Sequence, residues 1–93
     1  MIKSFKDKRT AAIFVGQYVR GLDRRLQARA LAQMQQIDLA EGLGDLAAVP
    51  GNRLERLRGN RADQWSVRIN RQWRICFLWR DGHAEEVEVV DYH

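Results

Sequence analysis

The strongest constraint on the fold of this 93-residue chain is an alternation of apolar and polar residues between positions 65 and 80. Large apolar side chains occupy every second position in two stretches: Trp65, Val67, Ile69, Trp73, Ile75, Phe77 and Trp79. Successive side chains of a β-strand point to opposite faces, so this period predicts strands with one buried face. A short polar segment, residues 70–72, separates the two stretches, which therefore predict an antiparallel hairpin.

The register of this hairpin can be predicted from the same pattern. A two-residue loop would pair Val67 with Arg74, which places an apolar side chain opposite a charge. A three-residue loop over residues 70–72 pairs Val67 with Ile75, and residues opposite each other in an antiparallel pair share a face. Since a slip of one residue turns the whole face over, the second register is favoured. It places Arg68 directly opposite Arg74 on the outer face.

The first half of the chain has the period of helices. Asp7 can cap a helix over residues 8–19 that ends at Gly21, and Asp23 can cap a second helix over residues 24–39. The apolar positions at helical spacing are Ala11, Phe14, Val15 and Tyr18 in the first helix and Leu26, Ala30, Met34 and Ile37 in the second. Both helices are expected to pack through these faces.

Further strands are expected at both ends of the chain. Residues 2–5 can form a first strand, residues 42–51 read as an irregular connection, and residues 54–57 can add a strand before the hairpin. Asp81-Gly82 is a turn signal, after which residues 86–89 alternate in a last strand. The fold class is therefore predicted to be α+β, with two N-terminal helices packed on one face of a small antiparallel sheet.

Length and composition bound the class of protein. The length predicts a single domain, residues 1–93, and a hydrophobic content of 45% argues against disorder. The longest apolar run, residues 11–15, is far shorter than the ~18 residues that suggest a membrane span. The N-terminus lacks the apolar segment of a secretory signal, and the one cysteine, Cys76, can form no internal disulfide. The chain is therefore expected to work in a reducing cytoplasm and not in a membrane.

Charge is distributed unevenly along the chain. Residues 53–80 contain eight arginines, no lysine and two acids, whereas residues 81–93 contain five acids and no lysine or arginine. The planar guanidinium matches phosphate and stacks on bases, so an all-arginine basic block favours binding to a polyanion such as nucleic acid. The alternative interpretation is a charged face that is simply solvated.

Two of these arginines predict a phosphate site. Like charges opposite each other on a sheet destabilise it unless an anion lies between them, so Arg68 and Arg74 predict a phosphate clamp. The alternative is that each pairs with an acid of the neighbouring strand, such as Glu86 or Glu88. The other predicted phosphate-binding residues are Arg56, Arg58, Arg61 and Arg71, together with Arg68 itself.

The chain ends in Asp91-Tyr92-His93, three consecutive groups with proton or hydrogen-bond chemistry. RNA cleavage needs a base for the 2′-hydroxyl, an acid for the 5′-oxygen and positive charge beside the phosphorane. His93 with Tyr92 or Asp91 can supply the acid and the base, and Arg74 can supply the charge. Taken alone, the tripeptide is weak evidence for a site, because frayed polar tails are common.

Other reactive side chains are given smaller roles. His83 follows a turn glycine and is expected to be solvated, while Cys76 falls on the arginine face but lacks a nearby histidine to activate it. No His/Cys cluster has the spacing of metal ligands, and the sequence contains no glycine-rich phosphate loop. Neither a metal nor a cofactor is therefore expected.

Four segments together resemble a known toxin family. They read Gly-Asn-Arg-Leu-Glu-Arg-Leu-Arg-Gly at residues 51–59, Trp-Ser-Val-Arg-Ile-Asn at 65–70, Gln-Trp-Arg-Ile at 72–75 and Asp-Tyr-His at 91–93. This combination resembles HigB, the toxin family of HigBA toxin–antitoxin systems in the RelE/ParE superfamily, and the resemblance covers essentially the whole chain. It implies a RelE-like α+β fold and cleavage of mRNA in the A site of a translating ribosome.

The resemblance also implies partners and site residues. The partners would be the ribosome, its mRNA and a HigA-like helix-turn-helix antitoxin, through which alone the complex would contact operator DNA. The residues that match the family's site are Arg74 as phosphate stabiliser and Asp91, Tyr92 and His93 as catalytic groups.

The chain departs from the family pattern in one segment. Some members carry a histidine and a lysine where this chain has Glu55 and Arg58, which leaves His93 as the histidine that can be placed in the site and leaves the acid and base unassigned. Two other functions stay open, namely a non-catalytic toxin that inhibits a protein such as gyrase, as in the ParE branch, and an RNA-binding module without a reaction. A ParE-like toxin has no need for a terminal Asp-Tyr-His beside strand arginines, and broken mRNA on expression would separate the nuclease from the RNA-binding module.

Overall fold

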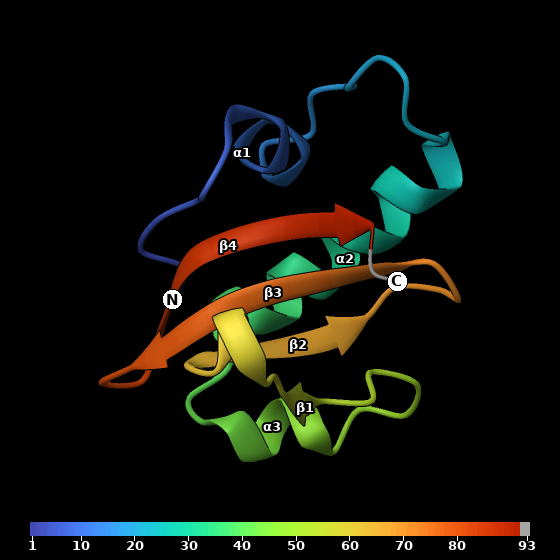
Figure 1. The fold of residues 1–93 in the computed structure, drawn as a ribbon. Coiled ribbons are helices and arrows are strands. Elements are labelled where there is room, and N and C mark those ends of the chain that lie inside the picture. Colours follow the sequence, from blue (N-terminus) through green and yellow to red (C-terminus); the bar gives the residue numbers. More distant parts are fainter. Residues whose placement is uncertain (92–93) are drawn as a thin grey trace.

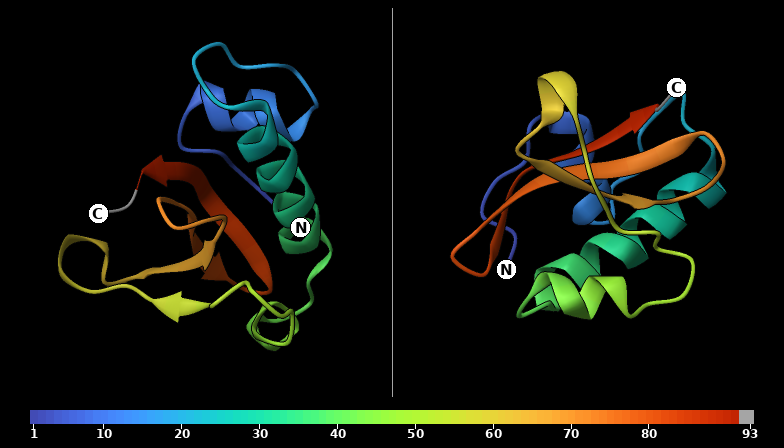
Figure 2. Two further views of the ribbon diagram at one scale, coloured as in Figure 1. Left: turned by 90° about the vertical axis from the view of Figure 1, so that its right-hand side faces the viewer. Right: turned by 60° about the horizontal axis from the view of Figure 1, so that its bottom comes forward.

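The computed structural model describes residues 1–91 and shows a sheet covered on one face by helices (Figure 1). The elements are α1 (Lys8–Phe14), α2 (Arg24–Leu39), α3 (Leu43–Ala47), β1 (Glu55–Arg56), the 3-10 turn η1 (Gly59–Arg61), β2 (Gln64–Arg68), β3 (Trp73–Arg80) and β4 (His83–Asp91). The strands pair antiparallel in the order β1-β2-β3-β4. The left-hand view of Figure 2 places α1 and α2 together on one side of the sheet and η1 on the other. The predicted α+β class is confirmed.

The β2–β3 hairpin has the predicted register. Val67 pairs with Ile75, and Arg68 pairs with Arg74. The turn is built by Asn70, whose side-chain oxygen accepts hydrogen bonds from the backbone N–H groups of residues 72 and 73, each at 2.8 Å. A short polar side chain that bonds its own turn in this way explains why the loop closes after three residues.

The main core lies between α2 and the sheet. α2 has the predicted bounds, and the side chain of its N-cap residue Asp23 accepts from the N–H of Leu26 at 3.1 Å. The predicted apolar line is buried with the inner face of the sheet, in a cluster that includes Ala30, Met34, Ile37, Val67, Ile75, Phe77 and Val89. Each large apolar side chain buried in this way stabilises the fold by about 1.5–3 kcal/mol.

α1 is shorter than predicted, and its packing face differs. Asp7 caps it as expected, but the helix ends at Phe14, not near Gly21. Its buried side chains are Thr10 and Ile13, whereas the predicted face positions Val15 and Tyr18 are 67% and 55% exposed. The physical reason is Gly16, which has a φ of 82°, a left-handed conformation that glycine adopts readily and that ends a helix.

The remaining segments confirm some predictions and correct others. Residues 2–5 run parallel to β4, but only as isolated bridges of Ile2 to Ala84 and of Phe5 to Val87, so the predicted first strand is not a full strand. The connection expected to be irregular contains α3. The hairpin turn at Asp81-Gly82 is confirmed, with both residues at positive φ.

Candidate active site

Arg74 lies on the outer face of the sheet, and several described residues hold its side chain. Its Nε donates to Ser66 Oγ at 2.7 Å, its Nη2 donates to the carbonyl oxygen of Arg53 at 2.8 Å, and the same Nη2 lies 3.7 Å from Glu55 Oε1. The Arg74 side chain is only 11% exposed, whereas that of Glu55 is 52% exposed. The guanidinium is therefore fixed in direction by β1 and β2 before any ligand arrives, while the carboxylate beside it is solvated.

A second small apolar cluster underlies this charged face. It consists of Leu57, Cys76 and Val90, all buried, from the end of β1 and from β3 and β4. Cys76 shares the arginine face, as predicted, since it pairs with Ser66. Burial raises the pKa of the Cys76 thiol above its ordinary value of 9.0 and outweighs the opposing effect of Arg61. The thiol is thus a neutral packing group and not a nucleophile.

The acid beside Arg74 is Glu55, whereas Glu88, which the alternative interpretation named, is bonded by Arg61. Arg61 Nη1 bonds Glu88 Oε1 at 3.1 Å and Gln64 Oε1 at 2.9 Å. Glu88 is therefore engaged by η1, and the acid that faces Arg74 is Glu55. The alternative interpretation, in which a strand arginine pairs with a nearby acid, therefore holds for Arg74, although this acid is Glu55 of β1 and not one of the two suggested on the last strand.

The other predicted phosphate-binding residues differ in their exposure and contacts. Arg58 and Arg71 are exposed, and Arg56 is exposed with its guanidinium 5.9 Å from the centre of the Trp65 ring. Arg68 lies opposite Arg74 as predicted, but its Nε donates to the carbonyl of Asn70 at 3.0 Å. The register of the clamp is confirmed, while binding of phosphate by the pair stays a prediction.

Asp91 ends β4 beside the hairpin loop. It pairs with Trp73, whereas Arg74 pairs with Val90, so alternation along the strand places Asp91 and Arg74 on opposite faces. Its Oδ2 accepts from Gln72 Nε2 at 2.9 Å. The predicted catalytic residues Tyr92 and His93 lie outside the described residues.

Sequence reasoning missed two contributors to the environment of Arg74. Ser66 is fully buried and accepts from the guanidinium, and strand alternation could have identified it because it lies diagonally across from Arg74. The backbone carbonyl of Arg53 left no signal in the sequence. His83 was expected to be solvated, which is wrong, because it is partly buried and its Nδ1 is enclosed without a hydrogen-bond partner among the described residues.

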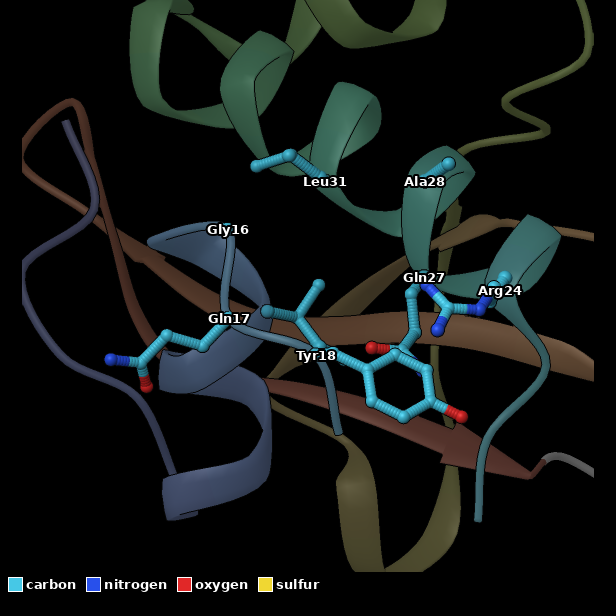
Figure 3. Close-up of a pocket in the computed structure, with 8 residues that line it drawn as sticks. Gly16, Gln17, Tyr18, Arg24, Gln27, Ala28 and Leu31 are labelled. Carbon is cyan, nitrogen blue, oxygen red and sulfur yellow. The ribbon is translucent and has the colours of Figure 1, made fainter. Parts of the chain in front are cut away.

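A separate pocket lies on the helical side of the sheet (Figure 3). It has a volume of about 190 Å³, and its lining includes Tyr18, Arg24 and Leu31. The guanidinium of Arg24 lies 4.4 Å from the centre of the Tyr18 ring. Gln27 bonds the backbone N–H and carbonyl of Val19, each at 2.8 Å, and so fixes the connecting segment to α2. This pocket is on the other side of the sheet from Arg74.

Two kinds of feature do not occur among residues 1–91. No group of three or more His, Cys, Asp or Glu side chains is placed to hold a metal ion. None of the helices in this part of the chain has the length and apolar character needed to cross a membrane.

Solved structures with the same fold are bacterial toxins. The YoeB chain fold in the YoeB–YefM complex from Staphylococcus aureus matches with a TM-score of 0.64 at 17% identity, covering 100% of this chain and 98% of the other. A YoeB dimer from the same organism matches with a TM-score of 0.63 at 18% identity, covering 99% and 97%. The chain thus shares the fold of the structures that contain the YoeB toxin.

Sequence comparison narrows the class to a family. Residues 3–93 match the family of HigB-like toxins, described as RelE-like toxins of the type II toxin–antitoxin system HigB. Endoribonuclease HigB of Proteus vulgaris is 34% identical over 97 residues, with 100% of both chains covered. Toxin HigB-1 of Vibrio cholerae serotype O1 is 42% identical over 52 residues, which span 56% of this chain and 55% of that protein. The chain belongs to the HigB-like toxin family.

Proposed function

We propose that this chain is an endoribonuclease toxin that cleaves mRNA on the translating ribosome and so inhibits translation. The observation that carries the proposal is the fixed guanidinium of Arg74 on the outer face of the sheet, in a chain that ends in Asp91-Tyr92-His93. The full-length relative named Endoribonuclease HigB supports the same reaction class.

The proposed reaction is attack of a 2′-hydroxyl on the adjacent phosphorus. A base among the C-terminal residues removes the 2′ proton, the new oxygen–phosphorus bond forms, and the bond to the 5′-oxygen breaks as an acid protonates that oxygen. Arg74 stabilises the negative charge that develops on the phosphorane. In this scheme His93 and Tyr92 act as the base and the acid, in either order. Asp91 holds the end of β4 through Gln72 or orients the imidazole of His93.

The exposed arginines have a binding role in this proposal. Three exposed arginines, Arg56, Arg58 and Arg71, would contact RNA phosphates around the cleaved bond. Arg61 and Arg68 would add positive charge nearby while they keep their contacts with Glu88 and Asn70. Such contacts release counterions, so they favour any RNA and leave the choice of the cleaved bond to the geometry at Arg74.

The proposed partners follow from the family. A HigA-like helix-turn-helix antitoxin would neutralise the toxin in the cytoplasm, and operator DNA would be contacted only through that antitoxin. The toxin–antitoxin complexes among the structural neighbours support an antitoxin partner.

The test is cleavage of a defined mRNA by purified protein, with and without programmed ribosomes. The wild-type protein is expected to cleave ribosome-bound mRNA, and Arg74→Ala and His93→Ala are expected to lose at least ~100-fold in rate. The matched control is Arg80→Ala, since Arg80 is an exposed arginine of the same strand that pairs with Glu85. Cleavage by Arg74→Ala at the wild-type rate would refute the mechanism. If expression of the wild-type protein arrests growth while mRNA stays intact, the target is a protein.

A further inference from the structure

The outer edge of β4 is closed by the N-terminal part of the chain. β4 is the last strand of the sheet, so its outward backbone groups have no further strand to pair with. Val87 is satisfied by residues before α1, because its N–H donates to the carbonyl of Ser4 at 3.1 Å and its carbonyl accepts from the N–H of Lys6 at 3.0 Å. Val89 is the next outward residue along the strand.

Both outward groups of Val89 are bonded by side chains from the first turn of α1. Thr10 Oγ1 accepts from its N–H at 3.0 Å, and Arg9 Nη2 donates to its carbonyl at 2.9 Å. Thr10 is fully buried, and its own N–H is capped by Asp7. The guanidinium of Arg9 also lies 5.6 Å from the centre of the Trp73 ring.

These contacts meet at the end of the sheet that carries the candidate site. Trp73 is the strand partner of Asp91 and precedes Arg74, and Val89 precedes Asp91 by two residues. Arg9 therefore joins the end of β3 to the end of β4 from the helical side. A planar guanidinium that bonds a carbonyl and lies over a ring fixes direction as well as distance, which an apolar side chain at this place would not do.

We propose that Arg9 and Thr10 are positioning residues that fix the backbone of β4, and with it the placement of Asp91 relative to Arg74. This inference rests on the proposed function, since it concerns the groups assigned to proton transfer. In this role Arg9 and Thr10 act through Val89. Because a misplacement of ~1 Å can cost about 100-fold in rate, loss of either contact should be visible in catalysis.

The test uses variants that remove one contact each. Arg9→Leu keeps apolar cover on Trp73 but removes the donor, and Thr10→Val keeps the shape but removes the acceptor, while Thr10→Ser retains the hydroxyl. The matched control is Arg24→Leu. It removes the same charge from an arginine that also lies over an aromatic ring, that of Tyr18, in the pocket of Figure 3.

Two readouts are measured on the full chain. In single-turnover cleavage on programmed ribosomes, Arg9→Leu and Thr10→Val should lower kcat by about 10- to 100-fold and change KM by less than about threefold. Thr10→Ser and Arg24→Leu should stay within about threefold of wild type. Amide hydrogen exchange at residues 89–91 should be at least about 10-fold faster in the two impaired variants only.

The outcomes separate this inference from the proposed function. Unchanged kcat in Arg9→Leu, with or without faster exchange, overturns the positioning role. Since Arg9 is exposed, this variant keeps the test valid if Thr10→Val does not fold. If the wild-type protein does not cleave ribosome-bound mRNA, the proposed function is overturned, and so is the expected loss of kcat in the variants. The exchange rates still decide whether Arg9 and Thr10 hold β4.

Discussion

Ser66→Ala should impair both folding and catalysis. Ser66 is fully buried, and its Oγ accepts from Arg74 Nε at 2.7 Å. A hydrogen bond to a charged group contributes about 1.5–3 kcal/mol to stability. The lower end of that range applies here, because the Arg53 carbonyl and Glu55 still contact Nη2. We therefore expect the free energy of unfolding to fall by about 1.5 kcal/mol.

A kinetic effect of at least similar size is expected because Nε sets the plane of the guanidinium. Without its anchor on Ser66, the guanidinium of Arg74 can pivot about Nη2, and a shift of ~1 Å at a catalytic group can cost about 100-fold, or about 2.7 kcal/mol of barrier. We expect kcat on programmed ribosomes to fall by about 10- to 100-fold while KM stays close to wild type.

The assay pairs urea unfolding, followed by tryptophan fluorescence, with single-turnover cleavage. The control is Ser4→Ala, which removes a hydroxyl that accepts from the N–H of Glu86 at 2.9 Å, away from Arg74. It should leave kcat unchanged. A Ser66→Ala variant with the wild-type kcat would show that Ser66 does not set the working orientation of Arg74, and the reasoning would fail.

Three further predictions concern other parts of the outer face. Glu55→Gln should change the free energy of unfolding by less than about 0.5 kcal/mol, because the carboxylate is half exposed and 3.7 Å from Arg74, but it should tighten RNA binding by removing a competitor for the guanidinium. Weaker binding, measured as KM for programmed ribosomes, would contradict this. Arg58→Gln and Arg71→Gln should each lower the slope of log affinity against log salt by about 0.7–0.9, and unchanged slopes would remove these exposed residues from the RNA contact. Cys76 should resist an aromatic disulfide reagent at pH 8 in the folded protein and react once it is unfolded, since burial raises its pKa above 9.0 and excludes solvent. Rapid reaction in the native state would show that the outer face opens.

The parts of the fold that the sequence predicts are those with strong local patterns. The β2–β3 register follows from alternation over a short span, because a slip would expose Val67 and Ile75 together. α2 follows from an N-cap aspartate and an apolar line at helical spacing. In both cases the local preference and the tertiary packing agree, so local reasoning suffices.

Other features depend on contacts between distant segments. The contact of Arg61 with Glu88 joins residues 27 positions apart, and it exists because η1 folds over the sheet. The neighbours of Arg74 on β1 depend in the same way on strand order. The early end of α1 depends on Gly16, whose left-handed conformation could be recognised locally, but the apolar residues that follow it suggested a longer helix.

The candidate site has two halves, Arg74 on β3 and the C-terminal residues that begin with Asp91 on β4, and these halves differ in their contacts. Arg74 lies in the interior strand β3, and its side chain is 11% exposed and bonded to β1 and β2. Asp91 ends the edge strand β4, is exposed, and bonds Gln72, which is itself exposed. The proposed reaction needs both halves at one phosphate, so we expect its rate to depend on how well the half on β4 is placed. RNA held in a fixed geometry by the ribosome would bring the phosphate to both halves at once. This is why we expect ribosome-bound mRNA to be cleaved much faster than free RNA, and equal rates would show that the protein alone completes the site.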